Sequence, residues 1–107
     1  MAKELFNLLG LAQRAGKIAS GEAAVKEALL RRKACLLIIT EDAGKSTRRK
    51  FAGWAEREGI PVYCAGTSYE LGLALGRTAR VIAAVTDPNF ARRIEQLLRS
   101  NNGEVED

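Results

Sequence analysis

The segment Ala43-Gly44-Lys45-Ser46-Thr47 has the residue types that bind a nucleotide phosphate. It follows an apolar run and precedes a helical pattern, as the phosphate-binding loop of a nucleotide hydrolase does. The complete motif needs a further glycine at the position of Ile39, so that backbone amides can wrap the phosphates. Because the Ile39 side chain obstructs that wrapping, the segment predicts a turn and a helix N-terminus. Nucleotide hydrolysis is the weaker alternative.

Few other residues offer catalytic chemistry. The chain contains no histidine, which removes every catalytic device that needs an imidazole and most transition-metal sites. Glu41 and Asp42 follow a predicted strand, where ligands gather in α/β sheets. Adjacent acids without a nucleophile or metal ligand nearby are more typical of a helix cap. We therefore expect no enzyme activity, no catalytic residues, no metal site, no cofactor and no small-molecule substrate.

The cysteines and the apolar runs bear on the compartment. Cys35 and Cys64 each lie inside an apolar run, and the chain has no Cys-x-x-Cys pair. Together with the lack of a signal-peptide pattern, they predict small buried side chains in a reducing cytoplasm rather than a disulfide. The longest apolar run, Ala34 to Ile39, is far shorter than the about 20 residues that span a bilayer. The sequence predicts a cytoplasmic protein with no membrane partner.

The charge balance favours a polyanionic partner. The 107 residues carry 17 Lys and Arg against 13 Asp and Glu, a net charge of +4. Three of those acids, Glu104, Glu106 and Asp107, lie in the last four residues. Without them, 17 basic residues stand against 10 acidic ones, which leaves +7 on residues 1–103. Nucleic acid is the favoured partner, and a solvated cationic face is the alternative.

Several basic residues lie near predicted junctions of strands and helices. A second group crowds the first turns of one predicted helix, where positive charge opposes the helix dipole unless an anion offsets it. A phosphate backbone would supply that anion. The residues at the junctions are Lys17, Lys26, Lys45, Arg77 and Arg80, and those of the crowded helix are Lys45, Arg48, Arg49 and Lys50.

Apolar periodicity predicts alternating helices and strands. Thr67 and Glu70 form a capping box, Asp87 and Pro88 begin a helix, and Gly59 ends one. Gly72 and Gly76 indicate close helix packing and a turn. The pattern predicts a three-layer α/β/α sandwich with about five helices and a small mixed sheet of about four strands. Residues 1–100 form one domain, and residues 101–107 form a polar acidic tail that we expect to be disordered. The expected strands are 18–19, 35–39, 62–64 and 81–85, and the expected helices are 3–15, 21–32, one ending at 59, 67–75 and 87–98.

Several short strings, taken in order, resemble the kink-turn RNA-binding ribosomal protein family, the superfamily of the L-seven-Ae and L-thirty-e proteins. Within it, the chain looks most like the small bacterial branch called YlxQ. The resemblance covers Leu5 to about Leu98 and depends on the order and spacing of the strings together. They are Leu8 to Lys17, Ser20-Gly21-Glu22, Leu36 to Asp42, Gly59 to Val62, Leu71-Gly72 with Gly76, and Ala79 to Pro88.

The resemblance implies a non-catalytic α/β/α protein that binds sharply bent RNA. It places the RNA on the loop and first turn of the second helix, the loop after the central strand, and the loop before the fourth strand. Helix-start amides would hold phosphates there, and small side chains would press against unstacked bases. With the basic residues of the junctions, the predicted RNA-binding residues are Lys17, Gly21, Glu22, Ala23, Ala24, Lys26, Glu27, Glu41, Asp42, Lys45, Arg77, Thr78, Ala79 and Arg80.

One departure from the family pattern affects specificity. Strong kink-turn binders in the family carry an Asn-Glu pair where this chain has Ala23 and Ala24, and Lys26 stands one place before the family lysine. The resemblance assigns base reading to that pair, so we expect phosphate contacts to persist and direct read-out to weaken. The sequence predicts a monomeric protein that binds structured RNA, with ribosomal RNA and a kink-turn as the candidates, and that associates with the ribosome. A protein-interaction module on the same fold is the alternative.

Overall fold

The computed structural model describes residues 1–101 and contains a four-stranded mixed sheet. The strand order is β1-β4-β2-β3, with β4 antiparallel to both β1 and β2 and with β2 parallel to β3. This confirms the predicted fold class. The strands are β1 (Ile18–Ser20), β2 (Leu36–Ile39), β3 (Val62–Cys64) and β4 (Ile82–Val85).

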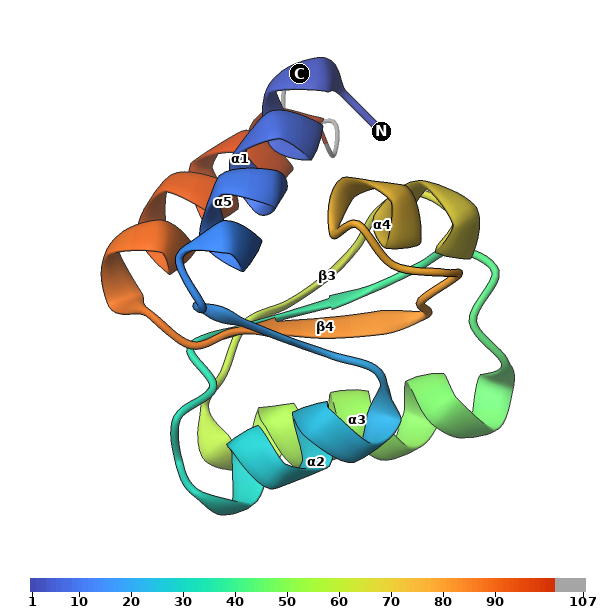
Figure 1. Ribbon diagram of the computed structural model, residues 1–107. Coiled ribbons are helices and arrows are strands. Elements are labelled where there is room, and N and C mark those ends of the chain that lie inside the picture. Colours follow the sequence, from blue (N-terminus) through green and yellow to red (C-terminus); the bar gives the residue numbers. More distant parts are fainter. Residues whose placement is uncertain (102–107) are drawn as a thin grey trace.

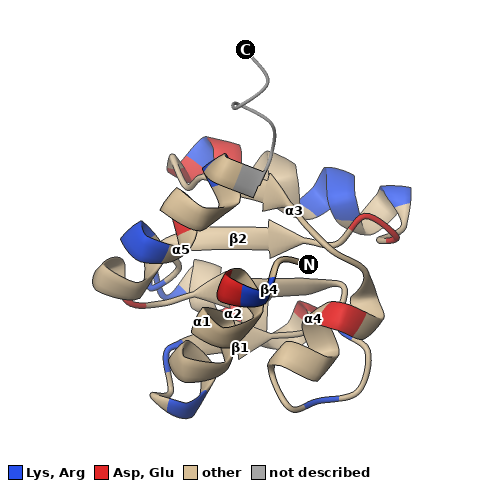
Figure 2. Ribbon diagram, turned by 90° about the horizontal axis from the view of Figure 1, so that it is seen from above, with Lys and Arg blue, Asp and Glu red and all other residues tan. Residues whose placement is uncertain are grey.

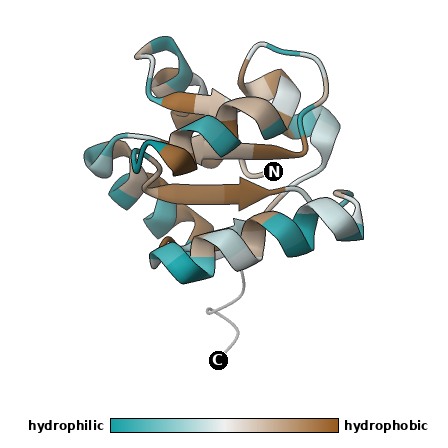
Figure 3. Ribbon diagram, turned by 90° about the horizontal axis from the view of Figure 1, so that it is seen from below, coloured by the Kyte–Doolittle hydropathy of each residue, from teal (hydrophilic) through white to brown (hydrophobic). Residues whose placement is uncertain are grey.

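Five helices cover the two faces of the sheet (Figure 1). Helices α1 (Lys3–Arg14), α4 (Ser68–Ala74) and α5 (Pro88–Asn101) lie on one face, and α2 (Glu22–Leu30) and α3 (Lys45–Glu58) lie on the other. Each face has its own apolar core. The strands are brown to tan in Figure 3, whereas the helices carry much of the hydrophilic teal.

Strand β2 contributes to both cores because successive side chains of a strand point to opposite faces. Leu36 and Ile38 pack with α1, α4 and α5, while Leu37 and Ile39 pack with α2 and α3. All four residues are buried. The predicted central strand, covered on both faces, is confirmed.

The predicted helix signals are also found at their positions. Thr67 and Glu70 form the capping box of α4, with the Glu70 N–H donating to the Thr67 hydroxyl. The Asp87 carboxylate accepts the N–H of Phe90 at 3.0 Å and so caps α5. Gly59 ends α3 in the left-handed conformation, with φ 72°.

Helix α5 continues through Asn101, and the rest of the predicted tail, residues 102–107, lies outside the described residues. One expectation differs from the structure. Cys64 is exposed, because it is the last residue of an edge strand, and it is not the buried side chain that we predicted. Cys35 is half-buried, and burial, followed by the nearby Asp87 charge, raises the pKa of its thiol. Both cysteines are free thiols.

The sheet topology brings distant loops to one end of the molecule. Because β4 runs against β1 and β2, the ends of β1, β2 and β3 lie beside the start of β4. Helices α2, α3 and α4 therefore all begin at this end, next to the segment that enters β4 (right side of Figure 1). We call this end the helix-start edge and define it as residues 21–27, 41–48 and 76–80.

Candidate nucleic-acid interface

The start of α2 depends on a glycine. Gly21 has φ 91° and ψ 160°, a conformation that is essentially confined to glycine. Its N–H donates to the carbonyl of Ile82 at 2.9 Å, which ties the start of α2 to β4. Among the described residues, no side chain caps this helix start. Ala23 and Ala24 are exposed in its first turn, so the surface around the first amides is formed by small side chains.

The start of α3 lies beside the start of α2. The Thr47 hydroxyl donates to the Glu22 carboxylate at 2.8 Å, which links the first turns of the two helices. Gly44 is the N-cap of α3, and in the part of the chain that the structure describes no side chain caps this start either. Lys45 and Ser46 are exposed there. The predicted turn and helix N-terminus are confirmed at this segment.

Arg48 has a different role from that of the other basic residues of α3. Its Nη2 donates to the carbonyl oxygens of Glu41, at 3.1 Å, and Thr40, at 3.4 Å, while its Nη1 lies 3.6 Å from the Cys64 sulfur. The guanidinium is thus bound to the backbone that follows β2. The sequence pattern grouped Arg48 with the basic residues whose charge an external anion would offset. Its contacts show instead that the protein itself supplies hydrogen-bond acceptors for this guanidinium.

Asp42 caps a helix, but a different one from the helix that follows it. Its carboxylate accepts the N–H of Ser68 at 2.9 Å and the Ser68 hydroxyl at 2.8 Å, at the first residue of α4. These bonds, chiefly the one from the hydroxyl, lower the pKa of Asp42. The start of α4 therefore has both a capping box and a carboxylate, in contrast to the starts of α2 and α3. Figure 2 shows the red loop that follows β2 beside the blue first turns of α3.

The segment before β4 packs tightly on α4. A Cβ built on Gly72 would lie 2.1 Å from the carbonyl oxygen of Thr78, so only glycine permits this approach. The N–H of Arg77 donates to the Gly72 carbonyl at 2.8 Å, and the N–H of Arg80 donates to the Ser68 carbonyl at 3.0 Å. With Gly76 at φ 66°, the predicted close packing and turn are confirmed.

Arg80 joins this segment to the start of α2. Its Nη1 donates to the Thr78 hydroxyl at 2.9 Å and to the Ala79 carbonyl at 3.1 Å. A Cβ built on Gly21 would lie 3.8 Å from Nε of Arg80, which shows that the guanidinium rests against the α2 start. The geometry places a cation directly beside the uncapped amides.

Comparison with known proteins shows the family of this chain. The model of the ribosomal protein L7Ae/L30e/S12e/Gadd45 family matches residues 3–95. The chain belongs to this family. It is 39% identical over 95 residues to the RNA-binding protein YlxQ of Bacillus subtilis strain 168, a match covering 89% of this chain and 95% of that protein. The RNA-binding protein YlxQ of Enterococcus faecium is 27% identical over 96 residues, covering 90% and 92% of the two chains.

Solved structures of similar proteins share the fold. A Bacillus halodurans protein described as having unknown function aligns with a TM-score of 0.88 and 34% identity, covering 92% of this chain and 99% of that one. The Giardia lamblia 15.5kD RNA binding protein aligns with a TM-score of 0.74 and 21% identity, covering 94% and 92%. The second likeness concerns the fold alone.

The structure of this L7Ae-family chain brings most of the predicted RNA-binding residues to the helix-start edge. Lys17 lies at the other end of the sheet, because it precedes β1 and its carbonyl accepts the N–H of Thr86, which follows β4. Glu27 lies at the limit of the edge, beyond the first turn of α2, and pairs with Arg31 at 3.0 Å. The predicted residues gathered at the edge are Gly21, Glu22, Ala23, Ala24, Lys26, Glu27, Glu41, Asp42, Lys45, Arg77, Thr78, Ala79 and Arg80.

Sequence reasoning overlooked the outer flank of α4. Tyr69 and Leu73 are 68% and 53% exposed, although Leu71 and Leu75 of the same short segment are buried. The signal was present in the sequence, since apolar residues at 69 and 73 accompany a separate apolar pair at 71 and 75. When a short helix has apolar residues on two sides and only one side packs on the core, the apolar residues of the other side are exposed.

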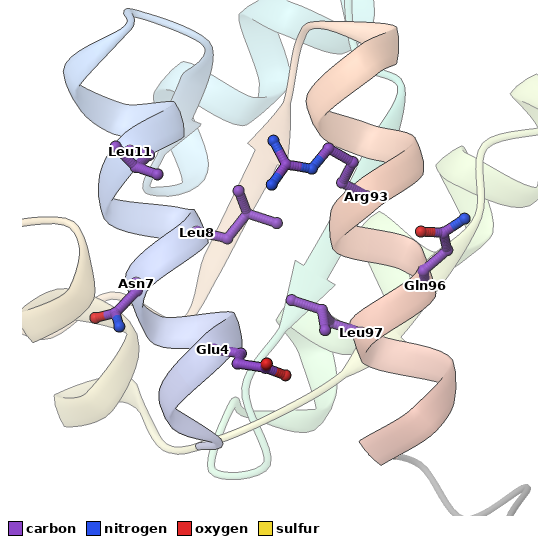
Figure 4. A pocket seen from close by; sticks show the side chains of 7 residues that line it. All are labelled: Glu4, Asn7, Leu8, Leu11, Arg93, Gln96 and Leu97. Atoms are coloured by element: carbon purple, nitrogen blue, oxygen red, sulfur yellow. The ribbon is translucent and has the colours of Figure 1, made fainter.

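Other features of the surface lie away from this edge. A groove of about 350 Å³ between α1 and α5 has Leu8, Leu11 and Leu97 in its lining, with Glu4 and Arg93 among its polar residues (Figure 4). It contains none of the residues predicted to bind RNA. Within residues 1–101, no cluster of three metal-binding side chains occurs, and no helix has the length and apolarity needed to cross a bilayer.

Proposed function

We propose that this chain binds structured RNA at the helix-start edge and performs no catalysis. The observation that carries the proposal is the pairing of two uncapped helix starts, α2 and α3, joined by the Thr47–Glu22 hydrogen bond. The first amides of a helix lack partners within it and favour an anion. Two such starts side by side, with Arg80 against Gly21, suit consecutive phosphates of a nucleic acid backbone.

The charges of the edge support the same partner. Lys26, Lys45 and Arg77 are exposed at or next to the two helix starts and the segment before β4. Several acids that would repel phosphate are instead bonded to protein donors. The Glu22, Glu27 and Asp42 carboxylates accept from Thr47, Arg31 and Ser68, respectively. The three carboxylates keep their charge, but these bonds orient them toward protein donors, while Lys26, Lys45 and Arg77 remain exposed.

The relatives supply a second line of support. Two YlxQ proteins named as RNA-binding match about nine-tenths of this chain, and the family is one of ribosomal proteins. We include in the proposal that the RNA is ribosomal or similarly folded, that the protein acts as a monomer, and that it works in the cytoplasm in association with the ribosome.

Kink-turn recognition is the finer part of the proposal. Ala23 and Ala24 present methyl groups in the first turn of α2 and offer no side-chain donor or acceptor to a base edge. Phosphate contacts from the amides and from Lys26 and Arg80 position an RNA without reading its sequence. We therefore propose that the protein accepts a kink-turn among other bent RNAs and prefers it only weakly.

The test is a titration of a kink-turn RNA and an unkinked duplex at several salt concentrations. The affinity should fall steeply with salt, because each neutralised phosphate releases counterions. Lys26→Ala and Arg80→Ala should weaken both RNAs by similar factors and reduce the salt slope by about 1 each. Lys33→Ala is the matched control, because Lys33 is exposed beyond the opposite end of α2. If neither RNA binds even at low salt, the proposal fails and a protein-interaction module is favoured.

A further inference from the structure

We propose that the outer flank of α4, formed by Tyr69 and Leu73, stacks an unpaired base of an RNA held at the helix-start edge. The inference rests on the proposed function and extends it to single-stranded nucleotides that flank the bound duplex. Large apolar side chains that are more than half exposed are uncommon in the described chain. They are Tyr69 at 68%, Leu30 at 65% and Leu73 at 53%, and two of the three lie on the seven-residue helix α4.

The position of this flank relative to the interface follows from helix geometry. Successive residues of an α-helix are turned by about 100°, so Tyr69 and Leu73 lie about 60° and 100° from Gly72 around the helix axis, in the same direction. Gly72 is the residue on which Thr78 packs. Ala74, whose carbonyl approaches Gly10 of α1, lies on the opposite side of that flank. Residues 77–80 thus form a continuous surface with Tyr69 and Leu73, away from α1.

The charge around the flank favours a nucleotide. Arg77 is exposed at the end of α4 and has no ion-pair partner within residues 1–100. Arg80 follows in the same segment, with its backbone hydrogen-bonded to Ser68. Arg77 is thus exposed and Arg80 half-buried in the segment that packs on α4. An aromatic ring combined with nearby cations is what single-stranded nucleic acid binding uses, with the base on the ring and the backbone near the cations.

The size of the flank argues against a protein as its occupant. A stable protein interface buries about 800 Å² on each partner, which two side chains on a short helix cannot supply. A single base needs only one ring face. The flank is also held in place, because Asp42 anchors the first residue of α4 and Thr78 packs on Gly72. A ring on a fixed helix loses little freedom when a base stacks on it.

The experiment compares a kink-turn hairpin with blunt ends against the same hairpin carrying a short unpaired flank that contains 2-aminopurine. A 5′ flank and a 3′ flank are tested separately. We expect the wild-type protein to bind one flanked RNA about ten-fold more tightly than the blunt RNA, as stacking of one base allows, and to quench 2-aminopurine fluorescence. Tyr69→Ala should lose both effects and retain its affinity for the blunt RNA, whereas Tyr69→Phe should keep both.

Leu30→Ala is the matched control, because Leu30 is equally exposed at the far end of α2. It should change neither affinity nor quenching, and thermal unfolding should show that every variant is folded.

Equal binding of flanked and blunt RNA by the wild type would overturn the inference and leave the proposed function standing. Loss of binding to the blunt RNA in Tyr69→Ala would also overturn it, since the flank would then serve the duplex. Failure of all RNAs to bind would remove the proposed function and this inference together. If Tyr69→Ala changes the oligomeric state measured by sedimentation but leaves 2-aminopurine quenching unchanged, the flank mediates contact between copies of the chain and the inference is overturned.

Discussion

The carboxylate of Asp42 accepts two hydrogen bonds from Ser68, one from the backbone N–H at 2.9 Å and one from the hydroxyl at 2.8 Å. The two residues are 26 positions apart in the sequence, and their contact joins the loop after β2 to the start of α4. The ionised carboxylate is the better acceptor, which is why these bonds lower the pKa of Asp42. The charge of one side chain therefore contributes to the placement of α4, beside its buried apolar residues and its capping box.

The first prediction concerns the pH dependence of stability. Because the pKa of Asp42 is lower in the folded chain than in the unfolded one, its contribution is complete above the unfolded pKa and is lost as the pH falls through the folded pKa. Asp42→Asn should lower the melting temperature at neutral pH, and its difference from the wild type should shrink in acid. Thermal unfolding monitored by circular dichroism from neutral to acidic pH measures this. Ser68→Ala should behave in the same way, and a difference that stays constant with pH would contradict the assignment.

The second prediction concerns the approach of Thr78 to Gly72. Gly72→Ala puts a methyl group where the Thr78 carbonyl stands, at 2.1 Å, so residues 77–80 must move. We expect a loss of about 1 to 3 kcal/mol in the free energy of unfolding, as for other overpacked sites, together with weaker RNA binding. Gly53→Ala is the control, since a Cβ there meets only the Arg57 side chain at 3.7 Å within a helix. Gly53→Ala should be stabilising by about 0.5 to 1 kcal/mol. Equal stability of the two variants would show that residues 77–80 move away from position 72 without a cost in stability.

The third prediction separates this chain from nucleotide hydrolases. Ile39 is a buried residue of β2, and its carbonyl accepts the N–H of Ala65. A phosphate-binding loop requires a glycine at this position, but in this chain the position is part of the sheet. ATP and GTP with Mg²⁺ should give no binding heat in calorimetry. Lys45→Ala should behave like the wild type in this assay while weakening RNA binding. Tight, Mg²⁺-dependent nucleotide binding that Lys45→Ala abolishes would refute the prediction.

Local signals in the sequence predicted the elements but not the contacts between them. The capping box at Thr67 and the helix start at Asp87 depend on residues a few positions apart, and both were found where expected. The bonds of Asp42 to Ser68, and of Arg48 to the carbonyls that follow β2, depend on how the strands are ordered. Periodicity carries no information on that order. Lys17 illustrates the same limit, because a strand of three residues separates it from Gly21 and thereby places it at the other end of the sheet.

The last prediction concerns the two alanines of the α2 start. Ala23 and Ala24 are exposed in the first turn of α2, whose N-cap Gly21 lies against the Arg80 side chain. The double change Ala23→Asn, Ala24→Glu would add an amide and a carboxylate that can bond to base edges. An acid in the first turn also suits the positive end of the helix dipole, so the fold should tolerate the change. Binding to a kink-turn should strengthen by about 1 to 3 kcal/mol, the range of good direct base contacts.

The comparison RNA decides how that gain is interpreted. Affinity for an unkinked duplex should barely change, because phosphate contacts are unaltered and the added carboxylate is slightly repulsive. Ala23→Gln, Ala24→Gln is the control, since it adds polar length to the same two positions without the family pair. Fluorescence titration of the wild type and both double variants against the two RNAs, at one salt concentration, gives the required ratios. If the wild type already prefers the kink-turn by several orders of magnitude, and Lys26→Ala removes that preference, then specificity resides in the residues that we assign to phosphate positioning.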